Sequence, residues 1–220
     1  MLDKVRLLDA TNMFEKQFSY NHYNGFDFHL LPFDIKLGTN PILISAPHAV
    51  NHIRNNRVKN ADLYTGAIAS IVQSYTNSFL IYSNRICDED PNYTIGGQYK
   101  SALKNLCNNN QIDYIVDLHG ASRERNFDID LGTMNGESID ENSINKIINI
   151  FRENGVKDVK NNAAFTASHP GTITSFSKNT LHIKAVQIEI NRFYRDPNHF
   201  EAYASLIKSL IEIIEHLKKG

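Results

Sequence analysis

The chain has 220 residues, of which 41% are hydrophobic and 21% are charged, and its formal net charge is −1. These values are typical of one soluble globular domain, so we expect a single domain over residues 1–220. A near-neutral charge argues against nucleic acid or an anionic membrane as a partner, because both need a basic excess. No apolar run approaches the roughly 20 residues of a membrane span, and no signal peptide is recognised, so we expect a cytoplasmic protein with two free thiols.

The first 35 residues predict little regular structure. Residues 1–25 are polar and aromatic without a clear period, and we expect a loose lead-in with one short helix around residues 13–18. Residues 26–35 mix alternating apolar residues with Pro32, which indicates an edge strand or an extended arm.

An apolar run within residues 41–50 predicts a buried strand that ends near a histidine. Pro47 cannot continue a strand ladder, so His48 begins the loop that follows. After a polar stretch, residues 62–75 carry apolar residues at helical spacing. We expect Asp62 in the first turn of this helix, where the helix dipole favours a carboxylate.

The next apolar segments predict a strand and a helix. Residues 78–83 form a continuous apolar run that closes at Asn84 and Arg85. Residues 87–93 are rich in turn-forming types and predict a loop over the same edge of the sheet. Apolar residues within 99–106 then mark a short helix.

Residues 112–120 read Ile-Asp-Tyr-Ile-Val-Asp-Leu-His-Gly and predict a strand buried on both faces. In open α/β sheets, ligand sites lie beyond the carboxyl ends of such strands. Asp117 and His119 share one strand face, which suits a metal-ligating histidine with a supporting carboxylate. A histidine that merely caps the strand is the alternative, but a second histidine at a strand exit, His48, favours the metal.

The rest of the chain continues the alternation of strands and helices. The predicted elements are a strand at 127–131, a helix at 138–154, a His-Pro-Gly turn at 169–171 that suits a lid or pocket wall, a strand at 184–190 and a closing helix from residue 196. Gln187 and Glu189 share one face of the late strand, where a buried carboxylate needs a partner or a function. We therefore expect a three-layer α/β/α fold with a mostly parallel, mixed central sheet.

Two histidines and one carboxylate are the usual protein ligands of a catalytic zinc ion, with one position left for water. His48 and His119 supply the histidines, and Asp62 is our choice for the carboxylate because it is close to His48 in sequence. Glu189 suits a general base beside the ion.

Asn84, Arg85 and Arg192 also follow the ends of apolar strands. A planar guanidinium recognises a carboxylate at two points, so these residues are candidates for substrate binding. We expect the partner to be a small molecule that carries a carboxylate.

This set of motifs resembles the N-formylglutamate amidohydrolase family, within the zinc-dependent exopeptidase-like hydrolases. The motifs are Ser45–His48, Asp62, Asn84–Arg85 with Asp90–Asn92, Asp117–Gly120, Asp130–Thr133 and Val186–Arg192, in the order of the family. The resemblance implies an α/β/α fold, one zinc ion and hydrolysis of an amide that joins a small acyl group or a terminal residue to an amino acid. By position it implies His48 and His119 as ligands, Glu189 as general base and Arg85 as the carboxylate clamp.

The third metal ligand and the substrate stay open. Carboxypeptidase-like relatives place their acidic ligand three residues after the first histidine, where this chain has Asn51, and His52 could ligate in place of Asp62. Our first hypothesis is a hydrolase of a small N-acyl amino acid such as N-formylglutamate. The alternatives are a peptidase for γ-glutamyl or peptidoglycan-derived peptides, and a relative that binds metal or ligand without turnover. Histidine and carboxylate ligands also accept divalent ions other than zinc.

Overall fold

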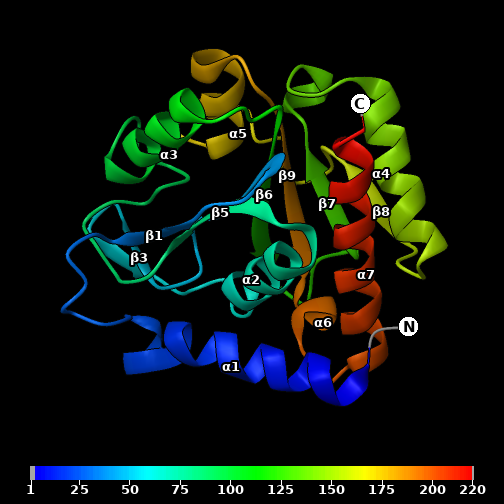
Figure 1. The fold of residues 1–220 in the computed structure, drawn as a ribbon, viewed down its shortest axis with the longest axis horizontal. Coiled ribbons are helices and arrows are strands. Elements are labelled where there is room, and N and C mark those ends of the chain that lie inside the picture. Colours follow the sequence, from blue (N-terminus) through cyan, green and yellow to red (C-terminus); the bar gives the residue numbers. More distant parts are fainter. Residues whose placement is uncertain (1–2, 220) are drawn as a thin grey trace.

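The computed structural model describes residues 3–219, which form a seven-stranded sheet between two layers of helices (Figure 1). The strands of this sheet are β1 (Phe33–Lys36), β2 (Asn40–Ala46), β5 (Ser78–Ser83), β6 (Tyr114–Ala121), β7 (Ile129–Gly132), β8 (Val159–Asn161) and β9 (Lys184–Asn191). Their order is β1-β5-β2-β6-β9-β7-β8. The four central strands β5, β2, β6 and β9 are parallel, whereas β1 and β7 join this group antiparallel. The predicted mostly parallel, mixed sheet is confirmed.

Helices cover both faces of the sheet. On one side lie α1 (Lys4–Tyr23), α2 (Thr65–Thr76), α4 (Glu141–Glu153) and α7 (Phe200–Leu217), and on the other lie α3 (Gln98–Asn109) and α5 (Ile173–Phe176). The short helices η1 (Met134–Gly136), η2 (Ser177–Leu181) and α6 (Arg192–Arg195) lie in connecting segments. Within residues 3–219, no helix combines the length and the apolar character that crossing a membrane requires.

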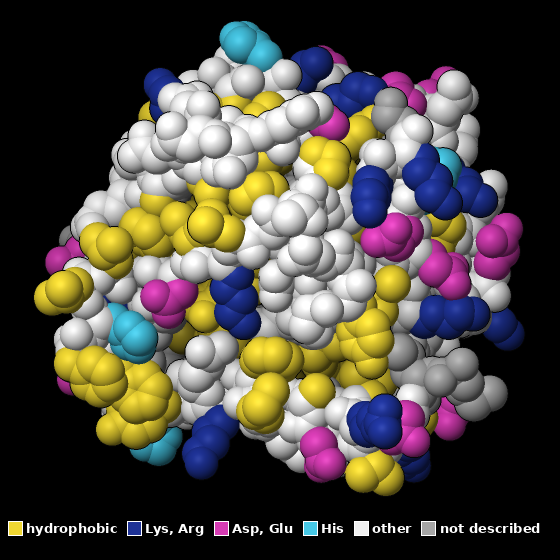
Figure 2. Space-filling view, viewed as in Figure 1, with side chains coloured by type: hydrophobic (Ala, Val, Ile, Leu, Met, Phe, Trp, Pro, Cys, Tyr) yellow, Lys and Arg dark blue, Asp and Glu magenta, His cyan; other side chains and the backbone are white. Residues whose placement is uncertain are grey.

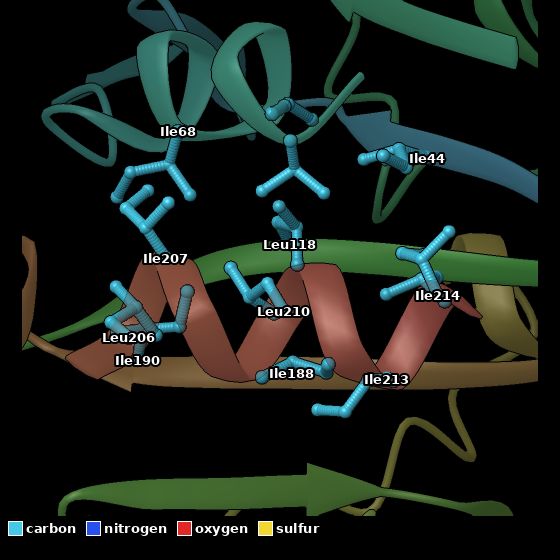
Figure 3. Packing of buried hydrophobic residues seen from close by; sticks show 14 of the residues in the cluster. Ile44, Ile68, Leu118, Ile188, Ile190, Leu206, Ile207, Leu210, Ile213 and Ile214 are labelled. Carbon is cyan, nitrogen blue, oxygen red and sulfur yellow. The ribbon is translucent and has the colours of Figure 1, made fainter. Parts of the chain in front are cut away.

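Alternate residues of the central strands enter two separate hydrophobic cores, because successive side chains of a strand point to opposite faces. In β6, Val116 and Leu118 enter the core beneath α2 and α7, while Ile115 enters the core beneath α3. Figure 3 shows the isoleucines and leucines of α7 packed between α2 and the central strands. Asp117 and His119 follow Ile115 on its face of β6, so polar groups replace the second core towards the end of the strand.

The N-terminal helix α1 is longer than the sequence predicted. Instead of a loose lead-in with a short helix around residues 13–18, α1 spans Lys4–Tyr23, although its backbone leaves helical geometry at residues 20–22. Two of the four buried side chains of this helix, Thr11 and Glu15, are polar, so the helix lacks a continuous apolar face. Both groups have partners in other segments: the Thr11 and Tyr203 hydroxyl oxygens are 2.9 Å apart, and the Tyr64 N–H donates to Glu15 at 3.1 Å. Glu15 also accepts a hydrogen bond from the hydroxyl of Tyr23, at the end of α1.

Several other boundaries differ from the prediction. The helix expected at 62–75 begins at Thr65, so Asp62 lies in the preceding loop rather than in the first turn. The edge strand is confined to β1, and the closing helix α7 begins at Phe200 rather than at residue 196. A two-stranded hairpin, β3 (His52–Arg54) and β4 (Arg57–Lys59), was not predicted.

Exposed hydrophobic side chains gather in the segment between α1 and β1. Phe28, Leu30 and Leu31 are exposed there. In Figure 2, hydrophobic side chains collect at the left of the view, where this segment runs in Figure 1. This segment lies beside the carboxyl end of β5, because Phe33 pairs with Ser83 and the Asn84 N–H donates to the Pro32 carbonyl.

Candidate metal centre

The candidate metal centre lies at the carboxyl ends of β2 and β6. The chain leaves β2 through α2 towards one face of the sheet and returns to β6 through α3 on the other face. Such a reversal in strand order leaves a crevice at the strand ends, where α/β proteins bind ligands. His48 follows β2 by two residues, and His119 lies on β6. The Asp62 backbone N–H donates to the His48 carbonyl at 2.8 Å, which holds the Asp62 loop against the first histidine.

Three potential ligand atoms converge on one point. The Nδ1 atoms of His48 and His119 are 3.1 Å apart, and they lie 3.4 and 3.3 Å from Asp62 Oδ2. Ligands of a tetrahedral zinc ion with bonds of about 2.0–2.1 Å are about 3.3 Å from one another. The spacing and the donor types therefore fit a small divalent ion held by these three residues, the set that the sequence predicted.

The charges of this cluster are strongly coupled. Burial opposes protonation of both rings, but the carboxylates beside them outweigh it and raise the pKa of His48 and of His119. Burial also opposes ionisation of Asp62, yet its hydrogen bonds with the two histidines hold the pKa of that carboxyl well below its usual value. A metal ion must displace protons from these rings, so we expect binding to strengthen as the pH rises.

Each histidine has its second ring nitrogen fixed by a buried carboxylate. His119 Nε2 lies 2.9 Å from Asp117 Oδ2, and His48 Nε2 lies 2.8 Å from Asp90 Oδ1. Neither carboxylate side chain is exposed. An acceptor at Nε2 holds the proton there and leaves the Nδ1 lone pair free for a metal ion. The Asp117 interaction was predicted from its place on the strand. Asp90 was predicted to lie in a turn and is one of the motifs of the family resemblance, but its contact with His48 was not predicted.

The two other candidates for the third ligand occupy different roles. Asn51 donates to the His22 carbonyl and accepts from the Ala61 N–H, so it braces the loop before Asp62. His52 stacks on His48 with ring centroids 3.9 Å apart, and burial lowers the pKa of His52 to about 3.

A second group of donors, made by His48, His52 and Asp90, also lies close together. The Arg54 guanidinium, however, lies 2.5 Å from Asp90 Oδ2 and already supplies a positive charge at that carboxylate. A cation beside this guanidinium would meet electrostatic repulsion, so the group formed with Asp62 is the better metal site.

Glu189 lies beside the candidate ligands on the neighbouring strand. Its partner in the β6–β9 register is His119, and both residues line the same cavity. Burial raises the pKa of Glu189 to about 7, while the two histidines oppose this rise. Gln187 Nε2 donates to Glu189 Oε1 at 2.9 Å and so fixes the orientation of the carboxyl group. A carboxyl group in this state can both accept and release a proton near neutral pH.

The cavity above these residues has a volume of about 540 Å³. Its floor is formed by the ends of β6 and β9, one wall by the β3–β4 hairpin and the other by residues 164–169. Of the predicted His-Pro-Gly turn, His169 belongs to this second wall, and it stacks on Tyr93 with ring centroids 4.8 Å apart. Asp130 holds this wall in place, because its carboxylate accepts three backbone N–H groups, from residues 163, 164 and 165.

The residues expected to bind a substrate carboxylate do not line this cavity. Arg85 donates from Nε to the His29 carbonyl at 2.8 Å, and Asn84 Nδ2 lies 3.3 Å from His29 Nδ1. Arg192 places its guanidinium over the Tyr64 ring, 5.9 Å from the centroid. The structure thus brings together the predicted ligands and Glu189, and it places all three predicted substrate-binding residues elsewhere.

The cationic side chains of the cavity wall are instead Arg54 and Lys59, both from the hairpin. Asn55 and Asn56 both have positive φ, as the two central residues of a tight hairpin turn require. The sequence carried this signal, an Asn-Asn pair between the short segments His-Ile-Arg and Arg-Val-Lys. It was overlooked because both segments are short and rich in charge.

A buried arginine ties the elements of the site together. Arg195 donates to the carbonyls of Ile190, Leu63 and Ala121, which belong to β9, to the Asp62 loop and to β6. Its guanidinium packs against Gly120, where a Cβ atom would lie 2.5 Å from the Arg195 Cζ atom. The glycine after His119 is therefore required by this close approach.

Comparison of the sequence with models of protein families and with curated proteins gave no match. Comparison of the structure gave several. The crystal structure of N-formylglutamate amidohydrolase from Ralstonia eutropha JMP134 has a TM-score of 0.63 at 14% identity and covers 86% of this chain and 99% of its own. A gene product of Agrobacterium tumefaciens has a TM-score of 0.56 at 13% identity, with 84% and 94% covered.

A bacteriophage poly-γ-glutamate hydrolase has a TM-score of 0.51 at 18% identity and covers 88% of this chain and 91% of its own. At these identities the comparisons establish the fold, and the resemblance inferred from the motifs is confirmed at that level. The chain has the α/β fold of the N-formylglutamate amidohydrolase structure.

Proposed function

We propose that this protein is a metal-dependent hydrolase that cleaves the amide bond of a small N-acyl amino acid. One observation carries the proposal: three ligand atoms spaced for a tetrahedral ion lie beside the buried Glu189 in one open cavity. His48, Asp62 and His119 would hold the ion, and zinc is the ion that this donor set favours. When bound, such an ion activates water and polarises a carbonyl group.

Glu189 moves the proton in this reaction. Its carboxylate takes a proton from the attacking water as the oxygen–carbon bond forms, and it passes that proton to the amide nitrogen as the carbon–nitrogen bond breaks. The products are a carboxylic acid and an amine. The raised pKa of Glu189 supports both steps, because a group that titrates near the working pH can accept and donate with little penalty. Gln187 keeps the carboxyl group aimed at the cavity.

A peptide substrate, such as a γ-glutamyl or peptidoglycan-derived peptide, is the second candidate. The observation that favours it is a further cavity of about 430 Å³, which shares Arg54, Tyr93 and His169 with the first. A chain longer than one N-acyl amino acid would find room on the far side of these three side chains.

The experiment combines metal analysis with a substrate panel. Protein purified without chelators is analysed for bound metal, and the zinc-loaded enzyme is tested on N-formyl and N-acetyl amino acids and on γ-linked peptides. The variant Glu189→Gln should keep its zinc and lose turnover by about 10²–10⁴-fold. The control Glu201→Gln changes an exposed residue of α7 and should retain turnover.

Undiminished turnover by Glu189→Gln would end its assignment as the base. If the zinc-loaded wild type hydrolyses no member of the panel, a relative that binds without turnover becomes the better description. Absence of metal binding by the wild type would remove the proposed function altogether.

A further inference from the structure

We propose that Arg54 binds the substrate carboxylate, the role that the family resemblance implies for Arg85. This inference rests on the proposed function, since it names the residue that selects the substrate of that reaction. It starts from the cavity wall, where Arg54 and Lys59 are the two lysine or arginine side chains among the described residues. Arg85 and Arg192 bind carbonyl and aromatic groups outside the cavity.

The Arg54 guanidinium is held on two sides. Its Nε lies 2.5 Å from Asp90 Oδ2, and its Cζ lies 4.9 Å from the centroid of the Tyr93 ring. Tyr93 is stacked in turn on His169, so the face of the guanidinium rests on a two-ring stack. An arginine fixed in this way loses little further freedom when it binds a ligand.

The remaining end of the guanidinium is available. Among the hydrogen bonds of residues 3–219, none uses the Nη atoms of Arg54, and a third of its side chain is exposed. The two Nη groups form a planar fork that matches the two oxygens of a carboxylate. Lys59 lies on the same face of the hairpin, because the register pairs His52 with Lys59 and Arg54 with Arg57. Its ammonium adds positive charge without the two-point geometry.

Asp90 also connects this fork to the metal centre. The same carboxylate accepts the Arg54 N–H at Oδ2 and contacts His48 Nε2 at Oδ1. One buried carboxylate therefore joins the proposed carboxylate-binding side chain to a candidate metal ligand. A substitution at Arg54 can therefore disturb His48 through Asp90, so the zinc content of every Arg54 variant must be measured as a control.

The test measures binding without turnover. The probes are N-acetyl-L-glutamate and the corresponding diamide, in which both carboxylates are carboxamides. Each is titrated by calorimetry into zinc-loaded Glu189→Gln protein, with and without a second substitution. Adding Arg54→Gln should weaken binding of N-acetyl-L-glutamate by about 10–100-fold, as expected for loss of a charged two-point contact. Binding of the diamide should change less than about threefold, and Arg54→Lys should give an intermediate loss.

The matched control is Arg57→Gln, which removes an exposed arginine that pairs with Arg54 across the hairpin and does not line the cavity. Because Arg57 shares the face of Arg54 but lies outside the cavity, this variant controls for the loss of one positive charge, and binding of either probe should change less than about threefold. Equal weakening of both probes by Arg54→Gln, or a loss produced by Arg85→Gln and not by Arg54→Gln, would overturn the proposal. So would the absence of measurable binding of N-acetyl-L-glutamate. Selective binding through Arg54 in an enzyme that hydrolyses none of the panel would refute the proposed reaction and leave this inference standing.

Discussion

Replacing Asp117 by asparagine tests how far this carboxylate strengthens the candidate metal centre. Asp117 is fully buried in β6 and lies 2.9 Å from His119 Nε2, and its other oxygen has no hydrogen-bond partner within residues 3–219. Asparagine keeps the volume and one acceptor oxygen but removes the negative charge. Charged hydrogen bonds are roughly twice as strong as neutral ones, so we expect a loss of about 1–1.5 kcal/mol, or about tenfold in zinc affinity.

The alanine variant should lose more. Asp117→Ala leaves the His119 Nε2–H without an acceptor and lets the ring turn, so we expect a loss of about 100-fold in zinc affinity. Zinc affinity is measured by competition with a chromophoric chelator, and the melting temperature of the metal-free protein reports whether each variant folds. The control Asp113→Asn changes an exposed residue just before β6 and should bind zinc like the wild type.

Wild-type zinc affinity in both Asp117 variants would refute the reasoning, because the buried carboxylate would then contribute nothing to the ligand. An equal loss in Asp113→Asn would also refute it, since a general charge effect would explain the result. A weaker zinc site in a protein whose metal-free form melts as before would support the role assigned to Asp117.

Two further predictions concern residues outside the metal centre. Burial raises the pKa of Glu15 to about 7 from 4.5, the ordinary value of a glutamate, so the folded state binds the extra proton and stability should fall as the pH rises between these values. In urea unfolding, Glu15→Gln should therefore stabilise the protein by about 3 kcal/mol at pH 8 and by far less at pH 5. An equal stabilisation at pH 5 and pH 8 would contradict this prediction. Asp130→Ala removes the acceptor of three backbone N–H groups, so it should cost about 2–4 kcal/mol. It should also speed chymotrypsin cleavage after Phe165; cleavage at the wild-type rate would count against that role.

The parts of the site that the sequence predicted depend on local signals. β2 and β6 begin as continuous apolar runs, and each has a histidine within two residues of its end, so the pattern identified both the strands and the polar groups at their ends. The rule that ligands bind at the carboxyl ends of parallel strands then brought His48 and His119 together. The same reasoning placed Glu189, because β9 lies beside β6 with the same polar face.

The parts of the site and fold that the sequence did not predict depend on contacts between distant segments. Arg85 follows a strand end as His48 does, yet the structure shows the segment before β1 at that end, where the His29 carbonyl binds the Arg85 side chain. Strand order and loop packing determine which segment contacts the Arg85 side chain, and neither can be predicted from the sequence of residues 78–85. In α1, the buried Thr11 is paired with a tyrosine almost two hundred residues away, so the helix has no apolar period to detect.

The close packing of Gly120 against Arg195 links two positions that are far apart in the chain. Any side chain at position 120 would displace the guanidinium and with it the three carbonyl contacts that join β6, β9 and the Asp62 loop. We therefore expect the two positions to covary among proteins that share this fold. A natural chain with a larger residue after the second histidine should have replaced this arginine by a shorter side chain and should brace its third ligand by other means.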